Sequence, residues 1–78
     1  MPAILKIGPY RFLFFSNEGS EPPHIHVKAA ENEAKFWLQP ILLAANYGFN
    51  GRQLNEILGF VEEHRNEFLE AWDEYFSK

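Results

Sequence analysis

The sequence predicts an α+β fold: a small antiparallel β-sheet of about four strands with a long C-terminal helix packed on one face. Two patterns support this fold class. Up to residue 38, short apolar or alternating runs are separated by turn residues, as in a β-meander. From residue 50, apolar residues recur every three or four positions with no interrupting proline, as on one face of an amphipathic helix. Because 78 residues suffice for only one small core, we expect a single domain over residues 1–78.

The predicted β-meander occupies residues 1–40. Its longest loop, at 17–23, is rich in turn formers and contains two prolines, which have no N–H to donate to a sheet. The apolar run at 41–49 fits a short strand or a helical turn, so we treat it as a connector. Within the meander we expect strands at 3–7, 10–16, 24–29 and 33–38.

Side-chain alternation divides the predicted sheet into two faces. On the third strand Ile25 and Val27 share an apolar face, whereas His24 and His26 share the opposite one. This opposite face combines imidazole, basic and aromatic groups, contributed by Arg11, His24, His26, Lys28, Lys35 and Trp37.

A helix is expected over residues 50–77. Asn50 and Gln53 have the spacing of a capping box, in which each side chain satisfies a free backbone N–H of the first turn. Gly59 and the polar residues 64–66 allow a break into two helices. At 1.5 Å per residue, 26 helical residues would measure roughly 39 Å, which is longer than a sheet of short strands. We therefore expect the helix either to bend around the sheet or to pack on another molecule.

Composition excludes several classes of protein. The chain has no cysteine, and therefore neither a disulfide framework nor a thiolate zinc site. Its net charge of −4 belongs entirely to residues 50–78, which argues against nucleic-acid binding over the whole surface. No apolar run approaches the roughly 20 residues of a membrane span, so we expect a cytoplasmic protein with no membrane partner.

The aromatic content of 17% is high for so short a chain, since each ring has a large area to bury. Six rings can fill one sheet–helix core: Phe12, Phe14, Phe36, Phe68, Trp72 and Phe76. Among the others, Phe15, Trp37, Tyr47 and Tyr75 are left over. We expect these to contact a second molecule, either a second copy in a homodimer or a small cognate protein.

The His24-x-His26 pair is the strongest chemical signal. Two imidazoles on one face of a strand can share a proton-transfer site, with one protonated and one neutral near neutral pH, as general acid–base cleavage of RNA requires. Arg11, Lys28 and Lys35 are then the phosphate-binding residues, and Trp37 a base-stacking residue. An alternative is a metal site, for which a third ligand would come from Glu21, Glu33 or His64. Without a spacing that identifies this ligand, we expect no cofactor.

Four long motifs resemble a bacterial family of short proteins, domain of unknown function 4160. They are IGPYRF at 7–12, FSNEGSEPPHIHV at 15–27, EAKFWL at 33–38 and NYGF at 46–49. The family's PPHIHV motif maps onto residues 22–27. The resemblance implies a gene neighbour, another small protein of domain of unknown function 2442, in an arrangement similar to a toxin–antitoxin pair.

Two functions follow from these observations. The first is a component of a type II toxin–antitoxin-like module, as an RNA-directed toxin in which His24 and His26 act without a metal. The second is a non-catalytic binding module, an antitoxin or regulatory subunit that oligomerises through its aromatic face and helix. The clustered histidines favour the first, and the lack of a basic surface favours the second.

Overall fold

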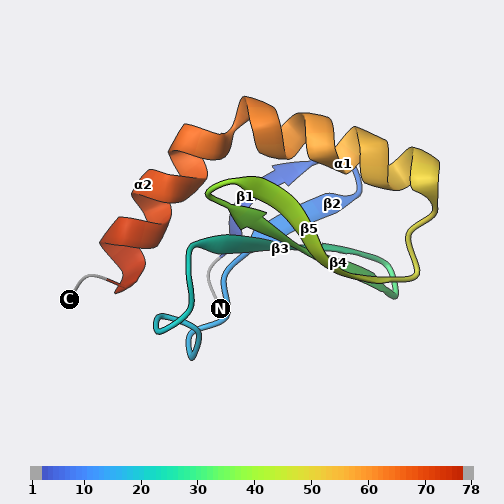
Figure 1. The fold of residues 1–78 in the computed structure, drawn as a ribbon. Helices are drawn as coiled ribbons and strands as arrows, with labels where there is room; N and C mark the ends of the chain where they lie inside the picture. Colours follow the sequence, from blue (N-terminus) through green and yellow to red (C-terminus); the bar gives the residue numbers. More distant parts are fainter. Residues whose placement is uncertain (1–2, 77–78) are drawn as a thin grey trace.

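The computed structural model of the protein describes residues 3–76 and confirms the α+β class (Figure 1). The predicted helix end at Ser77 and the outermost residues of the predicted domain lie outside the described residues. The elements are β1 (Ala3–Ile7), β2 (Tyr10–Leu13), β3 (His24–Ala29), β4 (Asn32–Leu38), β5 (Ile41–Tyr47), α1 (Gly51–Glu63) and α2 (Arg65–Phe76).

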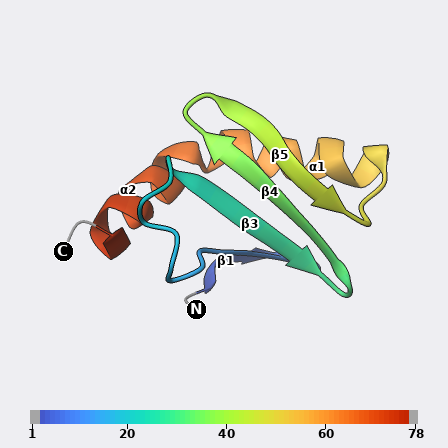
Figure 2. The same ribbon diagram turned by 60° about the horizontal axis from the view of Figure 1, so that its bottom comes forward.

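The sheet is an antiparallel meander in the order β1-β2-β3-β4-β5. Figure 2 shows β3, β4 and β5 side by side. The sheet has five strands rather than four, because the segment expected to be a connector contains β5. Here Trp37 pairs with Leu42 and Phe36 with Leu43 along β4. The apolar run is a strand because it forms hydrogen bonds with the neighbouring β4, and its local sequence alone does not indicate this pairing.

The second strand ends earlier than expected, at Leu13 instead of residue 16. Phe14 is completely buried and packs edge-on against Trp72 of α2, with ring centroids 5.3 Å apart. The chain therefore leaves the sheet to fill the space under α2 and enters the loop that leads to β3.

The predicted long helix is broken in two at His64, one of the two break points that the sequence allowed. The capping box is confirmed: the Gln53 N–H donates to Oδ1 of Asn50 over 2.8 Å, and the Asn50 N–H donates to Oε1 of Gln53 over 3.0 Å. After the break α2 passes the end of the sheet at which β3 begins (Figure 1). Arg65 ties the break to the sheet, because its Nε donates to the Leu38 carbonyl over 2.8 Å. The helix thus bends around the sheet.

The core lies between the helices and the apolar face of the sheet. Phe12 stacks on Phe68 with ring centroids 5.4 Å apart, and Ile25 and Val27 are completely buried. Of the six rings expected in the core, five are buried, and Phe76 packs against the core while half-buried. Among residues 3–76, no helix is both long enough and apolar enough to cross a membrane.

The four aromatic residues expected outside the core differ in exposure. Tyr47 is 68% exposed and Tyr75 39% exposed. Phe15 and Trp37 are half-buried against the His24/His26 face. The largest exposed apolar side chains of the described residues also include two that the sequence did not single out, Leu42 and Leu43 of β5.

Candidate functional site

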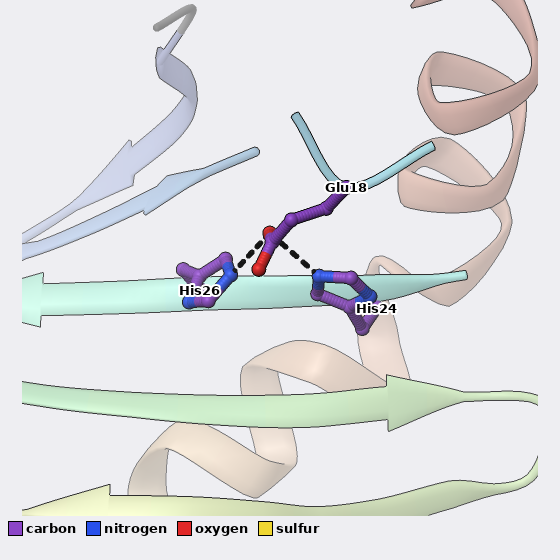
Figure 3. Close-up of side chains that lie close together, drawn as sticks. All are labelled: Glu18, His24 and His26. Atoms are coloured by element: carbon purple, nitrogen blue, oxygen red, sulfur yellow. Dashed lines mark hydrogen bonds and ion pairs between the residues drawn. The ribbon is translucent and has the colours of Figure 1, made fainter. Parts of the chain in front are cut away.

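The loop between β2 and β3 folds back over the start of β3 and brings the carboxylate of Glu18 into contact with both histidines. Oε1 of Glu18 lies 2.8 Å from Nε2 of His24 and 2.7 Å from Nε2 of His26. Figure 3 shows the three side chains directed at one point, the two imidazoles from the strand and the carboxylate from the loop. His24 and His26 share a face because they are two residues apart on a strand. We refer to these three residues as the Glu18–His24–His26 cluster.

The cluster is closed by aromatic rings. His24 is 0% exposed and His26 is 5% exposed. The His24 ring lies 5.4 Å from Trp37 and 4.9 Å from Trp72, measured between centroids. Phe15 stacks on His26 at 3.9 Å. Both imidazoles are therefore held in an apolar enclosure whose cover is the loop that carries Glu18.

Both ring nitrogens of His24 lie beside hydrogen-bond acceptors. Its Nδ1 lies 2.9 Å from the Pro22 carbonyl oxygen, and its Nε2 faces the Glu18 carboxylate. Partial burial pushes the pKa of the Glu18 carboxyl upward, but its hydrogen bonds and electrostatic interaction with His24 and His26 outweigh this and hold that pKa below its ordinary value. The cluster therefore favours the ionised form of Glu18.

His26 is less completely satisfied. Within the part of the chain that the structure describes, its buried Nδ1 makes no hydrogen bond. The nearest acidic group is Glu33, whose Oε2 lies 3.3 Å away. A buried polar nitrogen without a hydrogen bond is costly, and such atoms in a native fold call for an explanation.

The predicted phosphate-binding and stacking residues lie on the same face of the sheet but are engaged in different ways. Lys35 forms an ion pair with Glu21, with Nζ to Oε1 at 2.8 Å, and its Nζ lies 4.4 Å from the centroid of Trp37. Lys28 and Arg11 face each other across β2 and β3, one row away from the cluster. His24, His26, Lys35 and Trp37 are thus brought together, whereas Arg11 and Lys28 form a separate basic pair.

Glu18 is the functional residue that the sequence reasoning missed. None of the expected third ligands faces both imidazoles: Glu21 and Glu33 approach the opposite ring nitrogens, and His64 lies at the helix break bonded to Glu67. Glu18 precedes the histidines by six and eight residues, and no spacing rule connects them, because the contact depends on the whole loop folding back. The only sequence signal was that Glu18 lies inside the long motif FSNEGSEPPHIHV.

The family described as "Domain of unknown function (DUF4160)" matches residues 10–73 of the chain. The chain belongs to this family. The matched span contains the whole Glu18–His24–His26 cluster, its loop and strands β2 to β5, and leaves β1 outside. The curated proteins and the solved structures searched gave no significant match.

Proposed function

We propose that this DUF4160 protein is a non-catalytic protein-binding module that pairs through the open edge of β5, as one component of a type II toxin–antitoxin-like module. Its first partner is a second copy of the chain. The small neighbouring protein implied by the family resemblance then binds the dimer.

The observation that carries this proposal is the composition and exposure of β5. It is the last strand of the sheet, and its sequence ILLAANY contains no charged residue. Leu42 is 56% exposed, Leu43 47% and Tyr47 68%. Edge strands of monomeric proteins are usually guarded by charges, prolines or bulges, since an open edge templates pairing with another chain. The pairing of β5 has one irregularity, opposite Lys35 and Phe36, but the strand has no charge and no proline. The other edge, β1, carries the exposed Lys6.

The chemistry of the edge favours a second copy as the occupant. An uncharged strand that pairs antiparallel with its own copy brings no like charges together, and a two-fold axis makes the contact self-complementary. Pairing through the helices would instead bring together the acidic segment at 50–78 of two chains. Leu42 and Leu43 pair with residues on opposite faces of β4, so a continued sheet would cover apolar groups on both faces.

The closed cluster supports a non-catalytic role. Acid–base cleavage needs imidazole nitrogens that reach the substrate, whereas Nε2 of both His24 and His26 is engaged by Glu18 beneath aromatic rings.

One observation favours the second candidate, an RNA-directed toxin that cleaves without a metal. Lys6, Arg11 and Lys28 are paired in register across β1, β2 and β3, which gives one row of basic side chains on the face of the histidines. Such a row can follow a phosphate backbone. This function requires the Glu18 loop to open.

Sedimentation equilibrium of the full chain tests the proposal. We expect the natural protein to have twice the 9.1 kDa chain mass, and the variant Leu42→Lys/Leu43→Lys to have the mass of one chain with unchanged circular dichroism. Asn55→Lys is a matched control on the exposed side of α1 and should remain dimeric. A monomeric natural protein that cleaves single-stranded RNA in the presence of a chelator, and loses this activity in His26→Gln, would replace the proposal with the second candidate.

A further inference from the structure

We propose that Glu18, His24 and His26 form a binding site for one divalent transition-metal ion, with Zn²⁺ the best fit. This goes beyond the protein-binding function, because it concerns a cluster on β3, two strands away from the β5 edge, and does not depend on dimerisation.

The donor set and its convergence are the first argument. Oε1 of Glu18 and Nε2 of His24 and His26 all lie within 4.8 Å of one another. Two imidazoles and one carboxylate are the protein ligands of several zinc sites. Imidazole ligands suit zinc, copper, iron and nickel, whereas Ca²⁺ and Mg²⁺ prefer sites made of oxygen. The cluster is therefore selective for transition metals by its chemistry.

The outer partners of the histidines are the second argument. A metal-bound histidine nearly always donates its other ring N–H to a carbonyl or carboxylate, which fixes the ring and the tautomer. Nδ1 of His24 lies 2.9 Å from the Pro22 carbonyl, and Nδ1 of His26 lies 3.3 Å from Oε2 of Glu33. Both rings therefore already present Nε2 to the common point. His24 has the outer hydrogen bond of a metal ligand, whereas Nδ1 of His26 has a carboxylate oxygen nearby without a hydrogen bond.

A metal ion also suits the charge arrangement of the cluster. In its absence the single oxygen Oε1 of Glu18 lies within hydrogen-bond distance of two buried imidazoles. A bound ion would place a positive charge between the three donor atoms, facing the Glu18 carboxylate.

The distances between Glu18 and the histidines show that the cluster has to widen to hold an ion. Bonds of 2.0–2.1 Å to a tetrahedral ion separate neighbouring ligand atoms by roughly 3.3 Å, compared with the 2.7 and 2.8 Å between Glu18 and the histidines. Binding therefore requires the Glu18 carboxylate to move outward from both imidazoles, and its place on a loop allows this movement.

The surroundings assign the ion a structural role. The three side chains leave one tetrahedral position for a water molecule or the second oxygen of Glu18, under a cover of aromatic rings. Because the ion joins the loop to β3, and the loop lies against α2 where Gly19 contacts Phe76, binding stabilises the packing of α2 as well.

Calorimetric titration of the chelator-treated full chain with Zn²⁺ tests this site. We expect one equivalent to bind and to raise the melting temperature. Glu18→Gln and His26→Gln should each weaken Zn²⁺ binding by about 100-fold. Loss of an outer partner alone weakens metal binding by up to about 100-fold, and each of these substitutions removes a ligand itself. His64→Gln, which changes the third histidine at the helix break, is the matched control and should bind Zn²⁺ like the natural protein.

Titration of the natural protein with Co²⁺ tests the metal site without any variant, and so remains informative if a variant fails to fold. Intense visible ligand-field bands, displaced by one equivalent of Zn²⁺, would support a four-coordinate site. Absence of these bands in the folded natural protein would overturn the proposal, and so would equal Zn²⁺ affinity in folded Glu18→Gln. Since the titrations use the natural chain at any oligomeric state, their failure is distinguishable from a failure of the β5 interface.

Discussion

Gly19 of the β2–β3 loop lies directly against the ring of Phe76 in the last turn of α2. A Cβ atom on residue 19 would come within 2.6 Å of Cδ1 of Phe76 and 3.3 Å of its Cε1. The Phe76 ring in turn packs on Trp72 at 4.2 Å between centroids, and Trp72 contacts His24. The loop that covers the histidines is thus seated against α2 by a contact that has no room for a side chain.

We expect Gly19→Ala to destabilise the protein by about 1–3 kcal/mol, because the methyl group forces the Phe76 ring out of a packed aromatic cluster. Urea denaturation monitored by tryptophan fluorescence measures this change. Gly59→Ala is the matched control: a Cβ there meets nothing within 4 Å on α1, so the same substitution should stabilise the protein by about 0.5–1 kcal/mol. Equal effects of the two substitutions would show that the loop is not held by this contact.

A second prediction concerns the metal-free cluster. With chelator present, Glu18→Gln should lower the free energy of unfolding by about 1.5–3 kcal/mol, because the amide replaces the carboxylate oxygen that lies within hydrogen-bond distance of both buried imidazoles. The same denaturation experiment measures it. Glu31→Gln removes an identical charge from the exposed turn between β3 and β4, and its effect should stay within about 0.5 kcal/mol. A similar small effect for both variants would contradict this role of Glu18.

A third prediction concerns the junction of the two helices. Arg65→Lys should cost about 1 kcal/mol, because a lysine ammonium does not reproduce the fixed Nε–H that donates to the Leu38 carbonyl. Arg52→Lys, on the exposed start of α1, makes the same exchange where the structure gives no such bond to the sheet, and should be nearly neutral. Thermal denaturation of both variants measures the difference. A melting temperature of Arg52→Lys below that of Arg65→Lys would contradict this role of Arg65.

The parts of the fold that depend on local sequence patterns were predictable from the sequence. Alternation separated Ile25 and Val27 from His24 and His26, and the capping box located the start of α1. Features that depend on distant partners were not predictable. Strand β5 exists because β4 offers it a partner, and an apolar run by itself suits several structures.

The same distinction applies to the cluster. The two histidines were visible because their spacing of two residues puts them on one face of a strand. Glu18 was not visible, since its position results from the course of a loop that is seated on α2 through Gly19 and Phe76. The burial of His24 also depends on Trp72, which lies almost fifty residues further along the chain.

The last prediction is a dependence of stability on alkaline pH at Tyr10. Its hydroxyl donates to Oε1 of Glu56 over 2.8 Å, joining β2 to α1. Burial raises the pKa of the Tyr10 phenol, and the hydrogen bond to Glu56 and the negative charge of that residue raise it further. The folded state therefore holds this proton more tightly than the unfolded state, whose tyrosine pKa is about 10. The stabilisation is complete below about pH 10 and is lost as the pH rises through the folded pKa.

Denaturation curves at about pH 7 and about pH 11 test this dependence. Tyr10→Phe should be less stable by about 1 kcal/mol at neutral pH, because it lacks the hydrogen bond, and the difference from the natural protein should shrink at alkaline pH. Tyr47→Phe, on the exposed part of β5, should decline with pH like the natural protein. Curves for Tyr10→Phe that run parallel to those of the natural protein over the whole range would contradict a coupling between the Tyr10 proton and folding.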